Sequence, residues 1–433
     1  MAREKFIRPG YLYPKSTSNY IFTLLFLLYL FDYTDRLVVT SLFPFIQEDW
    51  GLTDTQLGSL VSAVYWSIVA LTFPVSLLVD RWSRKRTIGL MAIVWSVATA
   101  ACAFTGNFAT LFMARLFIGV GEAGYAPGGY AMISGMYPRE RHGWMMGLWN
   151  AAIPLGSAVG VALGGVIATH FGWRHAFGLV AIPGFIVAIL FFMIRDYKTV
   201  NLVKEKESGT KQKVMQKMSG RDIIREFTTK PALLLTYLGI TATVFVTTSL
   251  LTWLPTYFNR VQNLTEAQAG TKASLVMLLA IVGAPLGGFI ADKWRRREIR
   301  SSLFYPAIAT TLSAVFVLLS FVFLTGTIQY VALLMLGISV TSFIPGASAV
   351  TQELIHPGLR ATSYAIAVII QNLLGASTAP IVIGYISDKT NIQTAMALLP
   401  IPLVLASLFF FGASMYYKKD LTKVPKIDLE LKD

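Results

Sequence analysis

The sequence is poor in charged residues and almost free of cysteine. Only 14% of its 433 residues are charged, whereas 55% are hydrophobic and the mean hydropathy is +0.59. Soluble domains usually contain about 45–50% apolar and about 25% charged residues, so a soluble enzyme and a disordered adaptor are excluded. The single cysteine, Cys102, cannot form an internal disulfide, which excludes a secreted disulfide scaffold.

Histidine and acidic residues are also scarce. The chain has 4 His, and 23 Asp and Glu stand against 37 Lys and Arg, giving a net charge of +14. No histidine has metal-ligand spacing, and no phosphate-binding loop or catalytic triad spacing occurs. We therefore expect no metal, no cofactor, no ATP-driven step and no enzymatic activity.

Long hydrophobic runs dominate what remains. Each is read as a helix, because a segment that crosses lipid must satisfy its own backbone hydrogen bonds and no alternating barrel pattern is present. The expected fold is an all-α membrane protein with 12 transmembrane helices. The spans lie at roughly 18–42, 55–79, 87–105, 109–135, 143–168, 175–194, 232–258, 270–291, 302–324, 328–352, 361–386 and 393–417.

The basic residues are sorted by the loops that carry them. If the N-terminus is cytoplasmic, 31 Lys and Arg fall on the inner side and 4 on the outer side, and Arg36 and Arg115 lie within spans. Such a split predicts that both termini face the cytoplasm. The basic residues then serve to orient the chain in the membrane, so nucleic acid is not an expected partner. We expect a multi-pass protein of a bacterial inner (plasma) membrane.

The twelve expected spans divide into two groups of six. A cytoplasmic tail (1–17) precedes a first six-helix bundle (18–195), a cytoplasmic linker (196–230), a second bundle (231–417) and a cytoplasmic tail (418–433). The halves repeat each other: Leu52–Gly58 (LTDTQLG) matches Leu264–Gly270 (LTEAQAG) 212 residues later, and Arg141 matches Arg360 at an offset of 219. Two parallel six-helix repeats imply a pseudo-two-fold axis along the membrane normal and a site between the halves near the midplane.

One repeated loop carries a family resemblance. Gly288–Arg297 (GFIADKWRRR) and Ser76–Lys85 (SLLVDRWSRK), again 212 residues apart, resemble the signature loop of the major facilitator superfamily. The first copy departs from that pattern, having Ser76 where the family has glycine. The resemblance covers the whole chain and implies a secondary transporter that exposes its site alternately to the two sides of the membrane.

Within that superfamily the sequence is most similar to the Spinster family of lysolipid and sphingolipid transporters. The anion:cation symporter branch, which includes carriers of sugar acids, shares several of the same stretches. Asp32 departs from both, because relatives usually carry asparagine there. The stretches are Asp32–Arg36 (DYTDR), Arg115–Tyr125 (RLFIGVGEAGY), Ala152–Ser157 (AIPLGS) and Leu359–Thr362 (LRAT).

Charged residues within the spans are few, and all lie in the first half. A charge at the centre of a membrane helix costs at least about 2.5–3.5 kcal/mol, so each one indicates a function or a partner. The second half has only Thr247 and Thr248 at the positions that match Asp35 and Arg36. Ion coupling is therefore expected in the first half. The second half is expected to offer it an apolar surface that carries hydroxyl groups. The charged residues are Asp32, Asp35, Arg36, Arg115 and Glu122.

Depth along the spans predicts an ion pair between Asp35 and Arg115, both about 9–11 Å below the outer face at about 1.5 Å per residue. Our hypothesis is that Glu122 and Asp35, with Asp32 as a further acid, exchange protons and compete with substrate for Arg115. An anionic headgroup suits a guanidinium fork. The alternatives are a static buried network and, for Asp32 with Arg36, a local pair one helical turn apart.

Further residues are candidates for the substrate cavity and for an inner gate. Cavity candidates are Tyr125, Arg36, Tyr65, Trp149, Thr247, Thr248 and Trp253, although the aromatic ones could equally anchor the helices at the interface. Glycines in the fourth span favour close packing over bending. The expected inner gate is a charge relay, with topology-setting charge as the alternative, and comprises Asp80, Arg81, Arg84, Arg141, Asp292, Lys293 and Arg360.

The sequence thus predicts a monomeric proton-coupled secondary transporter in the lipid bilayer. Its expected substrate is an anionic amphiphile such as a lysolipid or sphingolipid, and a small organic anion such as a sugar acid is the alternative. A sensor built on a transporter scaffold is disfavoured because the linker is too short to hold a folded domain. A passive channel is disfavoured because isolated paired charges do not line a continuous polar pore.

Overall fold

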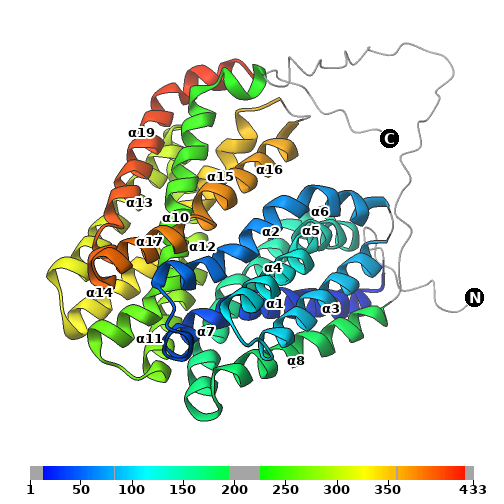
Figure 1. Cartoon of the computed structure of the whole chain (residues 1–433). Helices are drawn as coiled ribbons and strands as arrows, with labels where there is room; N and C mark the ends of the chain where they lie inside the picture. The colour runs from blue at the N-terminus through cyan, green and yellow to red at the C-terminus, as the bar shows by residue number, and fades with distance from the viewer. Residues whose placement is uncertain (1–12, 82, 195–224, 357–358, 425–433) are drawn as a thin grey trace, which may run out of the picture.

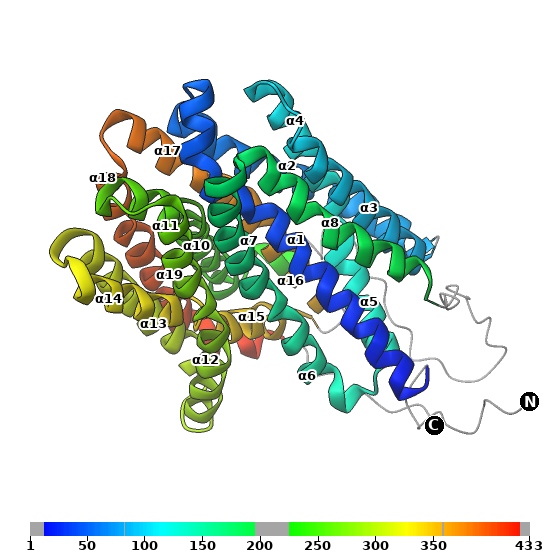
Figure 2. The same ribbon diagram turned by 90° about the horizontal axis from the view of Figure 1, so that it is seen from below.

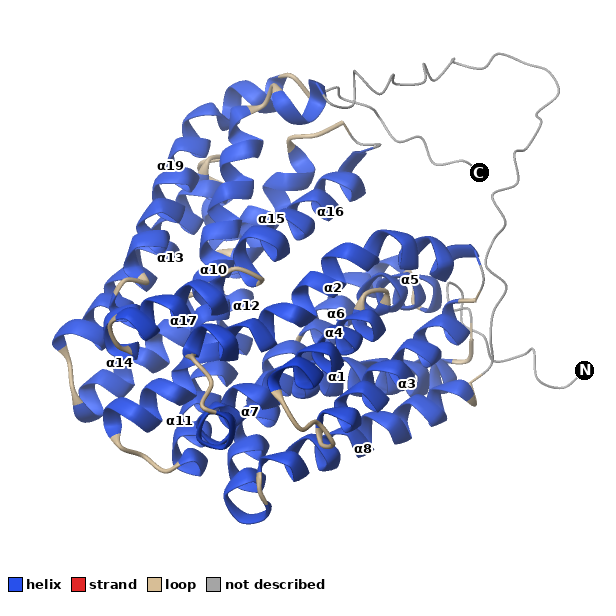
Figure 3. Cartoon of the chain, viewed as in Figure 1, coloured by secondary structure: helices blue, strands red, loops and turns tan. Residues whose placement is uncertain are grey.

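The computed structural model describes residues 13–81, 83–194, 225–356 and 359–424, without the side chains of 76–81, 139–140, 142–143 and 361. Within these residues the chain is helical, with no strand (Figure 3). Among the described residues, nine segments are long and apolar enough to cross a membrane. The other three expected spans are α1, α3, and α4 continued by α5, so the expected count of twelve agrees with the structure.

The first half contains six spans built from eight helices. Spans four and five are each divided in two, at Ala123–Gly124 and at Ala151. The helices are α1 (Lys15–Trp50), α2 (Asp54–Arg81), α3 (Arg84–Cys102), α4 (Phe108–Glu122), α5 (Tyr125–Met136), α6 (Arg139–Asn150), α7 (Ala152–Phe171) and α8 (Trp173–Phe192).

The second half repeats this plan, with π-helical turns in spans nine and eleven. Its elements are α10 (Pro231–Gln262), α11 (Glu266–Leu278), α12 (Ala280–Arg295), α13 (Ser301–Leu318), η2 (Leu319–Phe323), α14 (Gly326–Ser339), α15 (Ile344–Glu353), α16 (Arg360–Ile370), η4 (Gln371–Ala376), α17 (Ala379–Lys389), α18 (Ile392–Ala397) and α19 (Pro400–Thr422).

The sequence repeat is also a repeat of local structure. Gly51, with φ 63°, follows the last residue of α1, and Asn263, with φ 52°, follows the last residue of α10 212 residues later. In both turns a side-chain amide returns to the chain: Gln47 donates to the carbonyl of Leu52 at 2.9 Å, and Asn259 donates to that of Leu264 at 3.0 Å. The same short-range chemistry therefore turns the chain at corresponding points of the two halves.

The two bundles meet at one end of the molecule and diverge toward the other (Figure 1). Their shared end holds the loops after α1 and α10, which is the predicted outer end, and there α2 packs on α17 and α7 on α11. At the predicted cytoplasmic end α6 and α16 lie apart (Figure 1), and the view from below shows α7 beside α11 (Figure 2).

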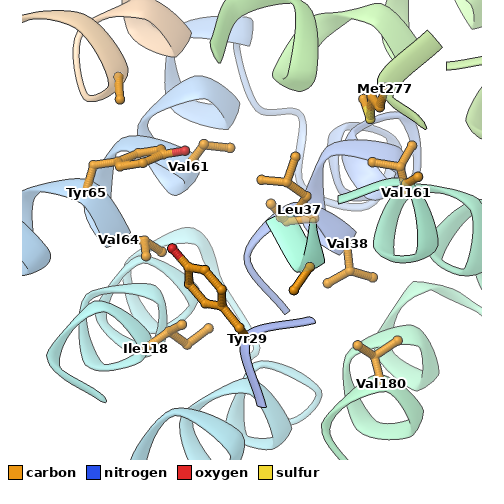
Figure 4. Close-up of a cluster of buried hydrophobic side chains, with 14 of the residues drawn as sticks. Tyr29, Leu37, Val38, Val61, Val64, Tyr65, Ile118, Val161, Val180 and Met277 are labelled. Carbon is orange, nitrogen blue, oxygen red and sulfur yellow. The ribbon is translucent and has the colours of Figure 1, made fainter. Parts of the chain in front are cut away.

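The hydrophobic core reflects the same shape. One large cluster runs from the first bundle into the outer part of the second, and Figure 4 shows a portion where Val161 of α7 and Met277 of α11 come from different halves. A separate smaller cluster, which includes Leu303, Phe343 and Tyr417, fills the cytoplasmic part of the second bundle. In the part of the chain that the structure describes, the bundles thus share a core only toward the predicted outer end.

Glycines in α4 and α7 set the spacing inside the first bundle. A Cβ on Gly156 would lie 2.2 Å from the carbonyl oxygen of Leu30, and one on Gly119 would lie 2.4 Å from that of Val64. No side chain fits at such distances, so these helices approach backbone to backbone. Close packing of this kind is what the sequence predicts for small residues in membrane helices, and it fixes the positions of the charged residues on α1 and α4.

Candidate functional site: a buried charge cluster on α1 and α4

A single guanidinium stands between two carboxylates at the middle of the first bundle. The Nη2 atom of Arg36 lies 2.7 Å from Oε2 of Glu122 and 3.3 Å from both carboxylate oxygens of Asp32. Asp32 is one turn before Arg36 on α1, and Glu122 is the last residue of α4. Arg36 is 6% exposed, Asp32 2% and Glu122 4%, so the three charges interact with little screening by water.

Two tyrosine rings enclose the guanidinium. Its central carbon lies 4.5 Å from the ring centre of Tyr33 and 5.3 Å from that of Tyr65. Cation–π contacts of this kind are strongest where water is excluded. Tyr65 was predicted from the sequence and Tyr33 was not, although Tyr33 precedes Arg36 by three residues and therefore shares its helix face. We call Asp32, Tyr33, Arg36, Tyr65 and Glu122 the Arg36 cluster.

The Arg36 cluster holds more acid than base. Two carboxylates face one guanidinium, so the group carries one excess negative charge when all three are ionised. A proton on either carboxyl would neutralise that excess. An anionic ligand would instead compete with a carboxylate for the guanidinium, whose fork matches carboxylate and phosphate oxygens.

Arg115 makes different contacts from those that the sequence predicted. Its Nε donates to the carbonyl of Leu60 at 3.1 Å, Nη1 to that of Asp35 at 3.1 Å, and Nη2 to that of Arg36 at 2.7 Å. Arg115 reaches the backbone of Asp35, so the two residues lie at the same level as expected, but the expected ion pair with the Asp35 carboxylate is wrong. The side chain is fully buried and joins α4 to α1 and α2.

The carboxylate of Asp35 points away from the Arg36 cluster. Its oxygens are buried, and among the described residues neither has a hydrogen-bond partner. It faces α3 and α8: Thr99 is close enough to interact with it, and its Oδ2 lies 3.9 Å from where a Cβ on Gly184 would stand. Asp35 and Glu122, both expected to exchange protons, therefore occupy different environments.

Tyr125 and Trp149 form an aromatic group beside the Arg36 cluster. Both donate to the carbonyl of Leu25, Trp149 at 3.3 Å, and both are fully buried. Tyr29 lies between them and stacks on Trp149 with ring centres 4.2 Å apart. Because their polar atoms already bond to backbone, these two candidates support α1 in this conformation and present no free group to a ligand.

The second-half candidates lie on α10, which packs against α1. The hydroxyl of Thr247 bonds to the carbonyl of Thr243 at 3.0 Å, and Thr248 is buried. Trp253 donates to the carbonyl of Pro380 at 3.1 Å, and its ring centre lies 5.2 Å from that of Phe43 in the first half. Trp253 therefore packs between the halves toward the predicted outer end, away from the Arg36 cluster.

The expected inner gate is only partly visible. The side chains of Asp80 and Arg81 lie outside the described residues, and Arg84 is half-buried. Arg141, Asp292, Lys293 and Arg360 are exposed. A network in the second bundle was not predicted: Glu353 binds Arg295 at 2.5 Å and accepts a hydrogen bond from the hydroxyl of Tyr417 at 2.5 Å. Arg295 lies in the same signature loop as Lys293, which was the available clue.

No group of three or more His, Cys, Asp or Glu that could hold a metal ion occurs in the part of the chain that the structure describes. The Arg36 cluster itself offers side chains that can bind ions and protons. It contains a cation for an organic anion, carboxylates for protons, and aromatic rings for apolar or cationic groups.

A family model described as Major Facilitator Superfamily matches residues 25–380, which is most of the chain. The protein belongs to this superfamily. It is an integral, multi-pass membrane transporter, as the repeated signature loop indicates. The superfamily is one of transporters and not of enzymes.

Relatives include both kinds of carrier that the sequence resembles. A hexuronate transporter of Bacillus subtilis is 27% identical over 70% of this chain and 72% of its own. Protein spinster homolog 1 of Xenopus tropicalis is 24% identical over 96% of this chain and 84% of its own. Among solved structures, a bacterial homologue of the human lysosomal transporter Spinster, inward-facing and unoccupied, superimposes with a TM-score of 0.82 at 21% identity, covering 94% of this chain and 98% of that chain.

Proposed function

We propose that the protein is a proton-coupled secondary transporter of organic anions that works by alternating access, with both termini cytoplasmic. The observation that carries this proposal is the Arg36 cluster, where one buried guanidinium is shared by two carboxylates. An incoming anion would displace Glu122 from Arg36, and the displaced carboxylate would take up a proton. Substrate and proton then depend on each other because they share one cation.

The shape of the molecule supports this assignment. The bundles share their core at the predicted outer end and diverge at the predicted cytoplasmic end, which is the arrangement of an inward-facing transporter. The similar Spinster homologue is described as inward-facing. The inner gate proposed from the sequence, a relay between the signature loops, would be broken in this state, in keeping with the exposure of Asp292 and Lys293.

The leading substrate class is an anionic amphiphile such as a lysolipid. Its headgroup would bind Arg36, and its chain would lie against the second bundle, which at the matching positions offers only Thr247 and Thr248. The similarity to Spinster proteins over nearly the whole chain supports this choice. The second candidate is a sugar acid, favoured by the similarity to a hexuronate transporter.

Reconstituted vesicles separate the two candidates. Purified protein in vesicles with an imposed pH gradient is offered a radiolabelled lysophospholipid and a hexuronate in parallel, with empty vesicles and Arg36→Gln vesicles as controls. We expect lysophospholipid movement that depends on the gradient and is absent from both controls. Gradient-dependent movement of hexuronate alone would identify the substrate as a sugar acid and not an amphiphile. Movement of neither anion would contradict the proposed function.

A further inference from the structure

A polar network joins the two halves at the predicted outer end. Arg260, near the end of α10, donates through Nη1 to Oδ2 of Asp54 and through Nη2 to Oδ1, each at 2.7 Å. Asp54 is the first residue of α2, so this bidentate pair bridges the bundles. The side chain of Asp54 is 5% exposed and that of Arg260 29%. Two parallel bonds from one guanidinium give both strength and a fixed geometry.

α17 adds to the network from the second half. The carboxylate of Asp388 accepts from the backbone N–H groups of Asp54 and Thr55 at 2.7 and 2.9 Å, and from the Thr55 hydroxyl at 2.5 Å. It therefore supplies a negative charge to the N-terminus of α2, which such termini favour. Ser387 donates to Oδ2 of Asp54 at 2.6 Å.

The sequence repeat creates a second seam with the same backbone geometry. In the α2–α17 seam, a Cβ on Gly58 would lie 2.2 Å from the carbonyl oxygen of Pro380. In the α7–α11 seam, a Cβ on Gly270, which is the repeat partner of Gly58, would lie 2.8 Å from the carbonyl oxygen of Val161. Gly384 and Gly165, related by the offset of 219, make the matching contacts with the carbonyls of Asp54 and Glu266.

The charges of the two seams are not equivalent. At the offset of 212, Arg260 corresponds to Glu48, and Asp54 corresponds to Glu266. Two glutamates cannot form the ion pair that an arginine and an aspartate form. Ser387 and Asp388 correspond at 219 to Ala168 and Thr169, which supply no carboxylate. Across the α7–α11 seam, Ser274 donates to the carbonyl of Ala158 at 2.8 Å.

We propose that Asp54, Arg260, Ser387 and Asp388 form an outer latch that operates on the α2–α17 seam alone. Opening the outer end breaks this latch and leaves Asp54 without its cation, whereas the α7–α11 seam parts without losing an ion pair. The latch therefore biases the protein toward the state that is closed outside. This inference concerns the conformational equilibrium, and it stands whichever substrate is carried.

Pulsed electron paramagnetic resonance tests the latch without any transport assay. Spin labels go on Gly106→Cys, in the loop before α4, and on Thr327→Cys, at the start of α14; both are exposed positions at the predicted outer end, and the buried Cys102 is replaced by Ala. In the purified protein, Asp54→Asn and Arg260→Gln should each raise the ratio of long to short distances between the two labels at least about fivefold. This factor is the lower end of what typical coupling energies produce. Glu266→Gln, the matched change on the other seam, should leave the ratio unchanged.

A gain of function provides a second arm of the same test. Glu48 corresponds to Arg260 in the repeat, and Glu266 corresponds to Asp54. Glu48→Arg would therefore give Glu266 a cationic partner, and it should lower the fraction of molecules that show the long distance between the labels. If Asp54→Asn does not fold, Arg260→Gln and Ser387→Ala are used instead, with the same expected increase in the ratio of long to short distances. Latch variants with the parent distance distribution, or a Glu266→Gln shift as large as that of Arg260→Gln, would overturn the proposal.

Discussion

Replacing Arg36 by Gln is expected to stop transport while the protein stays folded. The change removes the cation that Glu122 and Asp32 share, and truncating one partner of a buried charge pair costs about 2–5 kcal/mol. Because about 1.4 kcal/mol is a factor of ten, the initial rate in reconstituted vesicles should fall at least about thirtyfold. The fold should survive because the Glu122 carboxyl can become neutral by taking up a proton.

The matched control is Arg174→Gln. Arg174 also pairs with a carboxylate, Asp49, at 2.9 Å, but both side chains are about two-fifths exposed, at 40% and 44%. Exposed pairs contribute about 0–1 kcal/mol, so this variant should transport at the parent rate. Size-exclusion profiles report whether each protein is folded. An Arg36→Gln protein that transports normally would contradict the role given to Arg36.

Arg115→Lys is expected to have its largest effect on stability. A guanidinium can donate to the carbonyls of Leu60, Asp35 and Arg36 at once, whereas an ammonium is a compact point charge without the planar fork. Hydrogen bonds from charged donors contribute about 1.5–3 kcal/mol each. Losing one or more of them should lower the melting temperature well below that of Arg36→Lys, which keeps its ion pair with Glu122.

Thermal melting followed by intrinsic fluorescence makes this comparison directly. The two Arg→Lys variants differ in position but not in chemistry, so each controls for the other. If Arg115→Lys melted like the parent and lost only substrate binding, Arg115 would return to the substrate-binding role that the sequence predicts for it.

The fold could be predicted almost entirely from the sequence. Twelve apolar runs gave the spans, and the 212-residue repeat predicted matching local structure, which Gly51 and Asn263 show at the ends of α1 and α10. The short interruptions within spans, such as the break at Ala123–Gly124, were not predicted. Hydropathy reports where a segment is apolar but not where its helix changes direction.

The charge cluster was predicted in part. Depth along a helix can be counted from sequence, and it placed Arg115 at the level of Asp35. The direction of a side chain around the helix axis depends on which helices pack on each face. Asp35 and Arg36 are neighbours in sequence but point to different sides of α1, so the guanidinium of Arg36, and not that of Arg115, faces Glu122.

The outer latch was not predicted for a related reason. Arg260 is one of the four basic residues that the sequence places on the outer side, and Asp54 is part of the repeated LTDTQLG motif; neither was expected to pair with the other. Their contact joins positions 206 residues apart, and it depends on how the halves meet. The available clue was the replacement of Asp54 by Glu266 and of Arg260 by Glu48 between otherwise matching turns.

The measurement that tests the central claim most directly is the pH dependence of transport by Glu122→Gln. Glutamine fills the same volume but cannot bind a proton, so uptake driven by an imposed pH gradient should disappear while exchange of substrate across the membrane at equal pH persists. A variant that keeps both gradient-driven uptake and the parent pH profile would show that the proton is carried elsewhere, and the account of a guanidinium shared by substrate and proton would be wrong.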